Sequence, residues 1–423
     1  MVLVALLLFV LLPVAIATTF QPYPRHPSTK TINCDHFLDN DVSETMESDE
    51  RVRMYDPIEQ NLPMDCLSII TRFPYRTKPR SDYEGNFPIA YVRIVFTDYY
   101  YLETIFRATY EPQNYYCYFV DSSSNELFHK RINALASCFP NVVVSNVELD
   151  LDSNGTNTNA AVIACLEELV KFKDWKYVIM QQNHDVPIKT NREIVDIFKI
   201  LNGANDIGCT PPTVHIPEAD WSMKGMQFFK NKTLNKTIKP NDVYPTKAAM
   251  QASVSREAVE YILNELDLST FLETLSEIYY ASDEYLWATL SCNDNFELPG
   301  GFTRECFPHG NSFTRTSVWT DTKNVYKCKS KQSRHDICIY GLEDIYKFAV
   351  SHDIFANKIM PDFDFGALEC TIERLYNRSN GLMYPREGLD LQYYENLSQV
   401  RYMASRIANG GIRPDNGTFI CGP

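Results

Sequence analysis

The chain has 423 residues, enough for one large domain or two modest ones. Its 44% hydrophobic and 13% aromatic residues can fill a real core, which excludes a disordered polymer. The net charge of −14 is spread along the chain and argues against sequence-independent nucleic-acid binding, because that needs a basic surface.

The amino terminus begins with an apolar segment. Residues 2–17 are almost unbroken aliphatic sequence, interrupted only by Pro13. The run is shorter than the roughly 20 residues that a membrane-spanning helix needs. Ala15-Ile16-Ala17 has the form of a signal-peptidase site. A cleaved signal peptide and an uncleaved signal-anchor are both open, and either one places the rest of the chain in the lumen of the secretory pathway.

Two further features favour a lumenal protein. The chain has twelve cysteines and no metal-type C-x-x-C motif, so disulfides are expected in an oxidising compartment. It also has N-x-S/T sequons, which are candidate glycosylation sites. The sequons begin at Asn154, Asn231, Asn235, Asn377, Asn396 and Asn416.

The elements expected from the sequence alternate between strands and helices. Residues 18–85 are polar and rich in proline, which is typical of a stem region. Apolar β-rich runs predict strands at 91–96, 115–120, 141–144 and 176–180. Amphipathic spacing predicts helices at 102–109, 126–137, 160–172 and 192–201, the last capped by Thr190 or Asn191. This alternation predicts an α/β fold with a mainly parallel sheet flanked by helices.

The carboxyl ends of parallel strands are where such folds bind ligands, so the segments after Val120 and Met180 are the first candidates. Residues 203–246 carry two adjacent sequons and are expected to form a long exposed loop, a candidate lid over an acceptor site. Residues 293–336 look irregular. Further helices are expected at 255–263, 269–280, 283–290, 343–350, 365–376 and 397–408.

Six blocks of sequence, in order along the chain, carry a family resemblance. They are FPIAY at 87–91, RATY with PQNYYC at 107–117, SCFPNV at 137–142, DVPIKTN at 185–191, SDEYLWAT at 282–289, and CIYG with FANK at 338–358. Together they resemble the core 2/I-branching β1,6-N-acetylglucosaminyltransferase family, of which this chain looks like a divergent member. The blocks assign residues 86–376 to a catalytic domain and leave 377–423 as a carboxyl-terminal extension.

The resemblance implies an A-type glycosyltransferase fold with a Rossmann-like sheet, and a reaction that inverts the anomeric carbon. The implied donor is UDP-N-acetylglucosamine (UDP-GlcNAc). The implied acceptor is the 6-hydroxyl of a Gal or GalNAc residue in a glycan or glycoprotein. No metal or other cofactor is implied. The family also implies a single-pass protein of the Golgi membrane, or a secreted one if the first segment is cleaved.

The resemblance also pairs most of the cysteines. The implied disulfides are Cys66–Cys138, Cys117–Cys165, Cys328–Cys338 and Cys34–Cys370. Four cysteines are left over, at 209, 292, 306 and 421. Cys292 with Cys306 is the candidate local bridge among them.

Glu284 matches the catalytic base of the family. An inverting displacement needs one carboxylate to take the proton from the attacking hydroxyl. Ser282 is expected to cap a helix and to place Glu284 in its first turn. The alternative interpretation is that Asp283 and Glu284 only favour the start of that helix.

Donor binding is assigned to three residues. Lys358 matches the family lysine that stabilises the departing diphosphate. A second family cation falls near His335, and we favour Arg334, which a one-residue insertion could present. Asp121 is placed near the uridine, although it could equally begin a turn before Ser122.

Acceptor binding is assigned to Trp319, which would stack on a sugar ring or instead anchor a loop, and to Lys224 in a basic loop. Two D-x-D triplets, at 150–152 and 362–364, could in principle hold a cation. The first runs into a sequon and the second is as unconvincing, so no metal site is predicted.

The departures from the family leave two alternatives. One is a transferase for another UDP-sugar, such as UDP-xylose, and the other is a catalytically silent glycan-binding protein. Glu284 and Lys358 favour an enzyme. The stretch 247–251 replaces a G-S-A-Y-type motif of the family and, together with the shifted Arg334, favours the silent protein.

Overall fold

The computed structural model describes residues 22–39, 46, 50–55, 61–73, 75–307, 311–320, 327–382, 388–414 and 419–422. The apolar segment at residues 2–17 lies outside these ranges, and its two interpretations stay predictions. In the described ranges, no helix combines the length and the apolar character that crossing a bilayer requires.

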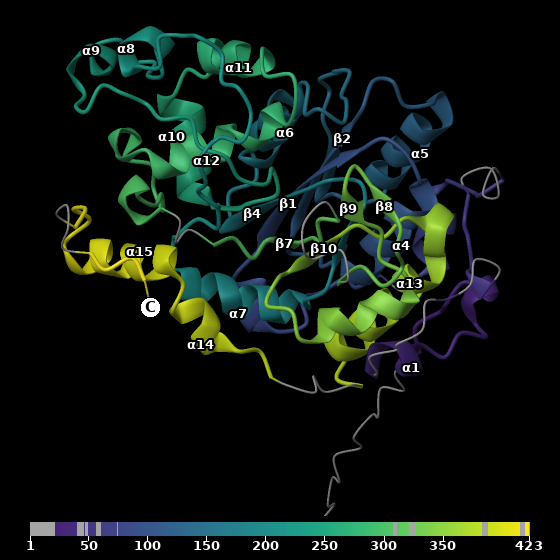
Figure 1. Ribbon diagram of the computed structural model, residues 1–423. Coiled ribbons are helices and arrows are strands. Elements are labelled where there is room, and N and C mark those ends of the chain that lie inside the picture. Colours follow the sequence, from purple (N-terminus) through teal and green to yellow (C-terminus); the bar gives the residue numbers. More distant parts are fainter. Residues whose placement is uncertain are drawn as a thin grey trace, which may run out of the picture.

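A five-stranded sheet forms the centre of the molecule (Figure 1). Its strands run in the order β3 (Val142–Val144), β2 (Tyr115–Val120), β1 (Ile89–Val95), β4 (Tyr177–Gln181) and β6 (Ser253–Ser255). The first four are parallel, and β6 is antiparallel to β4. This confirms the mainly parallel sheet expected from the sequence.

Both faces of the sheet are buried, which is why its strands read as continuous apolar runs. In β2, Tyr116 and Tyr118 enter one core, whereas Cys117 and Phe119 enter the other. The first core is covered by α4 (Tyr99–Thr109), α5 (Glu126–Ser137) and α13 (Pro361–Ser379, kinked at Asp364). The opposite core is covered by α6 (Thr158–Leu169), α10 (Arg256–Glu265), α11 (Ser269–Ser276) and α12 (Leu286–Cys292) (Figure 1).

A third core lies beside β4 and joins the carboxyl-terminal helices to the domain. It is formed by α7 (Asn191–Leu201), α14 (Leu391–Glu395) and α15 (Ser398–Ala408). Helix α7 begins with a capping box in which the Thr190 side chain accepts from the Glu193 N–H and the Glu193 carboxylate accepts from the Thr190 N–H. Of the two expected caps, Thr190 is therefore the one used.

Two small sheets lie past the carboxyl end of β4. In the first, β10 (Phe355–Asn357) pairs antiparallel with β5 (Asp185–Pro187) and parallel with β7 (Arg315–Thr316). The second is the hairpin of β8 (Ser333–Arg334) and β9 (Ile337–Cys338). These strands have two or three residues each, too few to show a periodicity in the sequence.

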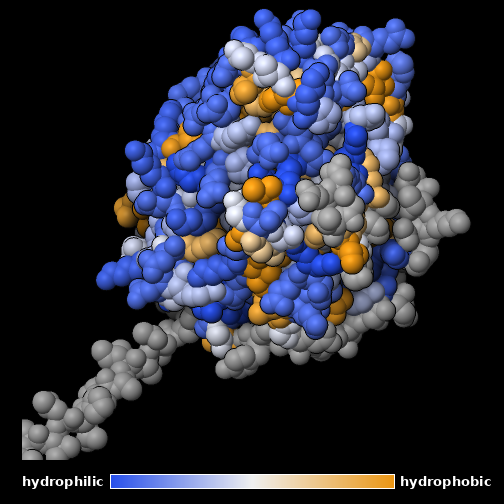
Figure 2. Space-filling view, turned by 90° about the vertical axis from the view of Figure 1, so that its left-hand side faces the viewer, coloured by the Kyte–Doolittle hydropathy of each residue, from blue (hydrophilic) through white to orange (hydrophobic). Residues whose placement is uncertain are grey.

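The remaining elements of the described residues are short, and they lie before β1 or between the longer elements. The α-helices are α1 (Cys34–Asp39), α2 (Cys66–Arg72), α3 (Asp82–Gly85), α8 (Met223–Met226) and α9 (Leu234–Thr237). The 3₁₀ helices are η1 (Pro27–Thr29), η4 (Ser282–Glu284), η5 (Asp294–Phe296), η6 (Arg304–Cys306) and η8 (Leu342–Ala349). One face of the molecule is mostly hydrophilic, with hydrophobic side chains scattered in separate patches (Figure 2).

The expected exposed loop at 203–246 is wrong for much of its length. It contains α8 and α9, and it buries Met223, Phe228 and Phe229 against α10 and α11. The lysines and sequons make the segment polar on average. Its composition therefore did not indicate the few apolar residues that pack it against the domain.

The described parts of the expected stem and of the carboxyl-terminal extension pack onto the domain. In the described part of the expected stem, Tyr23 is buried against Phe73 and Tyr376. At the other end, α14 and α15 lie on α7, and Cys421 is bonded to Cys306.

All twelve cysteines are paired. The four disulfides implied by the resemblance are present: Cys34–Cys370, Cys66–Cys138, Cys117–Cys165 and Cys328–Cys338. The expected Cys292–Cys306 bridge is wrong, because Cys292 pairs with Cys209 and Cys306 with Cys421. The fold brings residue 209 to the end of α12, so proximity in the sequence was misleading.

Candidate active site

A cavity of about 420 Å³ lies at the carboxyl ends of the central strands. Asp121 and His184, which follow β2 and β4, line it on one side. Five of the six residues predicted from the sequence to act in catalysis or substrate binding line this cavity: Asp121, Glu284, Trp319, Arg334 and Lys358. The sixth, Lys224, does not line it and is exposed on α8, so its acceptor role is not supported.

Glu284 lies in η4 and not in the first turn of an α-helix, so this expectation is wrong. Ser282 makes no helix cap, because its N–H donates to the carbonyl of Asn154 at 3.0 Å and the preceding Ala281 has a φ of 57°. Helix α12 begins only at Leu286. The loop around Asn154 therefore decides how the chain enters α12.

Gly155 in the same loop lies directly against Asp283. A Cβ atom at this glycine would meet the Asp283 Oδ1 at 2.3 Å, and its φ of +89° also favours glycine. Burial, followed by the charge of Glu284, raises the pKa of Asp283 to about 7. Two adjacent carboxyl groups thus lie in different environments, with Asp283 enclosed and Glu284 partly open to the cavity.

The Glu284 side chain forms an ion pair that the sequence did not indicate. Its Oε2 lies 2.9 Å from the Nζ of Lys247, and the two side chains are 20% and 17% exposed. Lys247 belongs to the stretch that departs from the family motif. The structure thus places a cation of this stretch directly at the candidate base.

Lys358 follows β10 and lines the same cavity. Its Nζ donates to the carbonyl oxygen of Arg334 at 3.4 Å. Burial, followed by the charges of Arg334 and Arg315, lowers the pKa of Lys358 to about 8. The preceding Asn357, joined to it by a cis peptide bond, donates to the buried Asp185 at 2.8 Å. Lys358 is thus held among like charges, where an anionic ligand would be stabilised.

Arg334 is carried by the β8–β9 hairpin. Its two turn residues, His335 and Asp336, have φ values of 53° and 58°, as a two-residue type I′ turn requires. His335 also lines the cavity, and burial, then Lys358 and Arg334, lower its pKa. The hairpin therefore brings both Arg334 and His335 to the cavity.

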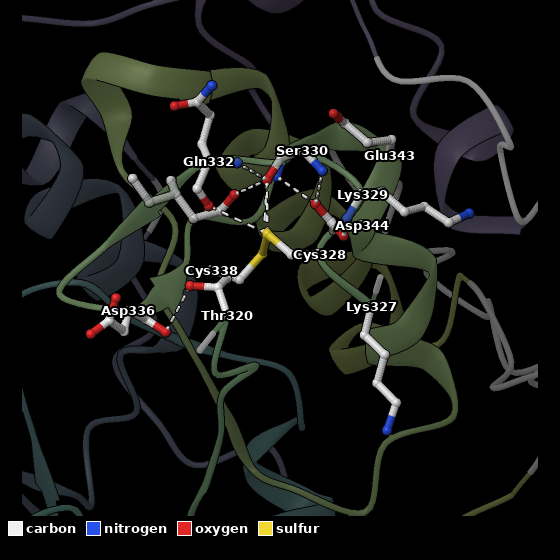
Figure 3. Close-up of a disulfide and its surroundings, with 12 residues drawn as sticks. Thr320, Lys327, Cys328, Lys329, Ser330, Gln332, Asp336, Cys338, Glu343 and Asp344 are labelled. Carbon is white, nitrogen blue, oxygen red and sulfur yellow. Dashed lines mark hydrogen bonds between the residues drawn. A yellow bond between two sulfur atoms is a disulfide. The ribbon is translucent and has the colours of Figure 1, made fainter. Parts of the chain in front are cut away.

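The Cys328–Cys338 disulfide fixes this hairpin (Figure 3). Beside it, the N–H groups of Lys329 and Ser330 donate to the two carboxylate oxygens of Asp344 at 2.9 and 3.1 Å. The hairpin that presents Arg334 is thus tied to η8.

Sequence reasoning missed Arg315, a third strong cation that lines the cavity from β7. Its side chain makes no hydrogen bond or ion pair with any residue in the described ranges, and its Nε is buried. Its charge acts on both Asp283 and Lys358. The two-residue strand that carries it lies in the segment read as irregular, and no signal in the sequence pointed to it.

Asp121 fits both interpretations given to it. Its Oδ1 accepts from the N–H and hydroxyl of Ser123 at 2.9 and 3.0 Å, which is the turn role, while the side chain lines the cavity. Trp319 is half-buried in the cavity wall, and its backbone pairs with Ile337.

One carboxylate of each D-x-D triplet is used in structural contacts. Asp152 accepts from the N–H groups of Asn154 and Thr156, and Asp364 from Arg51 and the N–H of Leu342. Within the described ranges, no group of three or more potential metal ligands occurs.

Among the predicted glycosylation sites, Asn235 is a correction. It is 1% exposed, and its amide bonds both the N–H and the carbonyl of Phe229 at 2.8 Å, which leaves no room for a glycan. Asn154, Asn231 and Asn396 are exposed, and Asn377 is partly exposed. Asn416 lies outside the described residues.

Comparisons with known proteins identify the family. The family model "Core-2/I-Branching enzyme" matches residues 89–349. A bovine (Bos taurus) β-1,3-galactosyl-O-glycosyl-glycoprotein β-1,6-N-acetylglucosaminyltransferase is 31% identical over 388 residues, 86% of this chain and 89% of the relative. A human (Homo sapiens) N-acetyllactosaminide β-1,6-N-acetylglucosaminyl-transferase is 31% identical over 317 residues, 73% of this chain and 76% of the relative.

Among solved structures, the mannosyltransferase Ktr4p of S. cerevisiae matches with a TM-score of 0.22 and 12% identity, over 61% of this chain and 82% of that one. That likeness is too distant to support an argument. The family match and the relatives suffice: this chain is a glycosyltransferase that belongs to the core-2/I-branching enzyme family.

Proposed function

We propose that this protein transfers N-acetylglucosamine from UDP-GlcNAc to the 6-hydroxyl of a Gal or GalNAc residue in a glycan, with inversion. The observation that carries the proposal is one cavity that contains both a carboxylate, Glu284, and the cations Lys358, Arg315 and Arg334. The activities that the names of the relatives state support the sugar and the linkage.

The proposed reaction is a single in-line displacement. The acceptor oxygen bonds to the anomeric carbon as the bond from that carbon to the diphosphate oxygen breaks, and the hydroxyl proton passes to Glu284. UDP leaves with the bonding electrons, and Lys358, Arg315 and Arg334 stabilise its developing charge. Asp121 would contact the uridine part of the donor, and Trp319 the acceptor sugar.

The cations also support a metal-independent reaction. Three cationic side chains line the cavity, whereas one carboxylate of each D-x-D triplet, Asp152 and Asp364, is engaged in structural hydrogen bonds. A nucleotide diphosphate would pair with charges that otherwise oppose one another.

The cellular compartment of the protein is also part of the proposal. Six disulfides and several exposed sequons support a protein that matures in the lumen of the secretory pathway. We propose that it works at the Golgi membrane, held by its amino-terminal segment.

Transfer assays test the function. The full chain, expressed in a secretory host, is incubated with UDP-GlcNAc or UDP-xylose and mucin-type acceptors, with and without EDTA. We expect GlcNAc transfer that EDTA leaves unchanged, and a fall in kcat of about 10²–10⁴ for Glu284→Gln, the usual contribution of a general base. Glu126→Gln, on the exposed start of α5, is the matched control.

Measurements of UDP binding test the donor-binding residues separately from transfer. Lys358→Met and Arg315→Met should weaken UDP binding, measured by calorimetry, whether or not an acceptor is known. UDP binding without transfer to any acceptor would support the silent glycan-binding protein, and transfer of xylose alone would replace the donor.

A further inference from the structure

Backbone hydrogen bonds and a nearby disulfide hold Lys247 beside Glu284. Its N–H and carbonyl exchange hydrogen bonds with Thr210 at 2.8 and 3.0 Å. The adjacent Cys209 is bonded to Cys292 at the end of α12, the helix that follows Glu284. The disulfide therefore ties the segment that pairs with Lys247 to the helix that follows Glu284.

The side chain of Lys247 has two partners. Its Nζ lies 2.9 Å from the Glu284 Oε2 and 2.8 Å from the hydroxyl oxygen of Thr213. The next residue, Ala248, donates its N–H to the carbonyl oxygen of Glu284 at 2.9 Å. Residues 247 and 248 thus fix both the backbone and the carboxylate of Glu284.

The contacts leave one carboxylate oxygen available. In the described part of the chain, the Glu284 Oε1 has no hydrogen-bond or ion-pair partner, whereas Oε2 is held by Lys247. Behind Glu284, Asp283 is enclosed against Gly155. A carboxylate held through one oxygen loses rotational freedom, and its other oxygen keeps a defined place in the cavity.

We infer that Lys247 is a positioning residue for the catalytic base: it holds the Oε2 of Glu284 so that Oε1 receives the acceptor proton. This inference rests on the proposed function. In the transfer step the proton moves from the acceptor hydroxyl to Oε1, and Lys247 stays protonated. The stretch that departs from the family motif therefore supports the base.

An inhibitory role for the ion pair between Lys247 and Glu284 would predict a faster variant and not a slower one. If the ion pair were an inhibitory latch, Lys247 would have to leave before the acceptor could bind, and its removal would raise the rate. If Lys247 only supported the fold, its removal would lower the melting temperature without a specific effect on kcat.

Steady-state kinetics of Lys247→Met and Lys247→Arg separate these roles, with UDP-GlcNAc and a β-1,3-galactosyl-O-glycopeptide as substrates. We expect Lys247→Met to lower kcat by about tenfold or more and to leave the KM for UDP-GlcNAc within about twofold, since positioning acts in the transition state. Lys247→Arg keeps the cation and should recover most of kcat. Lys130→Met removes an exposed ion pair with Glu126 and is the matched control.

Each outcome bears on the inference. An unchanged or increased kcat in Lys247→Met overturns it, as does a loss that Lys247→Arg does not recover. Melting temperature and UDP binding show whether Lys247→Met is folded. If it is not, Lys247→Arg and Lys247→Gln decide, with the arginine variant expected to be the faster. If the unmodified protein transfers no sugar, the proposed function fails and this inference fails with it.

Discussion

At the scale of single residues, the buried carboxyl group of Asp206 forms a polar centre beside the strand that carries Arg315. Asp206 is fully buried and accepts hydrogen bonds from Ser312, Phe313 and Thr314. Burial raises its pKa to about 6, although these hydrogen bonds act in the other direction. Gln399 of α15 also donates to it, so this carboxyl joins the carboxyl-terminal helix to the strand that carries Arg315.

Asp206 should make stability depend on pH. Its pKa is raised above the ordinary value of 3.8, so the folded state binds this proton more tightly than the unfolded state. The stabilisation from this proton is complete below about pH 4 and is lost as pH rises through about 6. We expect Asp206→Asn, which has no proton to lose, to lack this fall in unfolding free energy, a difference on the order of 3 kcal/mol between pH 4 and pH 7.

Denaturant unfolding of both proteins across this pH range is the measurement. The unfolding free energy of the unmodified protein, relative to that of Asp206→Asn, should be higher at pH 4 than at pH 7. Parallel pH profiles would contradict the prediction.

At the scale of elements, the site is assembled from short pieces that longer elements hold. Glu284 lies in a 3₁₀ turn, Arg315 in a two-residue strand and Arg334 in a hairpin. Such pieces have little stability of their own, because too few backbone hydrogen bonds offset the entropy of ordering them. Disulfides and neighbouring loops therefore supply the order.

The Cys209–Cys292 disulfide should matter for both stability and catalysis. Replacing both cysteines by alanine should lower the unfolding free energy by about 2–4 kcal/mol, as for other disulfides. It should also lower kcat, because Cys209 precedes the Thr210–Lys247 pairing beside Glu284.

The Cys306–Cys421 double alanine variant is the matched control, since both disulfides lie in the same small cluster. It should lose similar stability, measured by thermal melting, and keep its kcat. Equal losses of kcat in the two variants would show that the effect is general.

At the scale of the whole molecule, the described part of the expected stem, which includes Arg51, is part of the folded domain. Arg51 is buried, donates to Asp364 at 2.8 Å and Glu343 at 3.0 Å, and stacks on Phe363. It thereby joins η8 to the start of α13, on either side of the strand that leads to Lys358. Its position allows a residue remote in sequence to affect the donor side of the cavity.

Arg51→Met should destabilise the protein strongly. It would leave the carboxylates of Glu343 and Asp364 buried without their cation, which typically costs about 3–5 kcal/mol. The KM for the donor should also rise, because the Tyr340 N–H, next to η8, bonds the carbonyl of Lys358.

Melting temperature and donor kinetics test this prediction. Arg192→Met, which removes an exposed ion pair with Asp196, should change neither. Stability within about 1 kcal/mol of the unmodified protein, the usual range for surface changes, would contradict a structural role for Arg51.

The sequence by itself determined the four parallel strands of the central sheet and five of the residues that line the cavity. Apolar runs such as 115–120 predicted β2, and helical spacing predicted α5 and α7, because a buried strand and an amphipathic helix leave distinct local patterns. The ordered blocks identified Glu284 and Lys358, which the fold brings to one cavity.

Only the tertiary structure decided several of the contacts between distant segments at the site. The sequence could not show that Asn154 takes the N–H of Ser282, that Cys209 pairs with Cys292, or that Lys247 holds Glu284. Arg315 could likewise not be predicted from the sequence, because its two-residue strand forms only when β10 lies beside it. These contacts depend on the path of the whole chain, whereas local patterns record only the preferences of neighbouring residues.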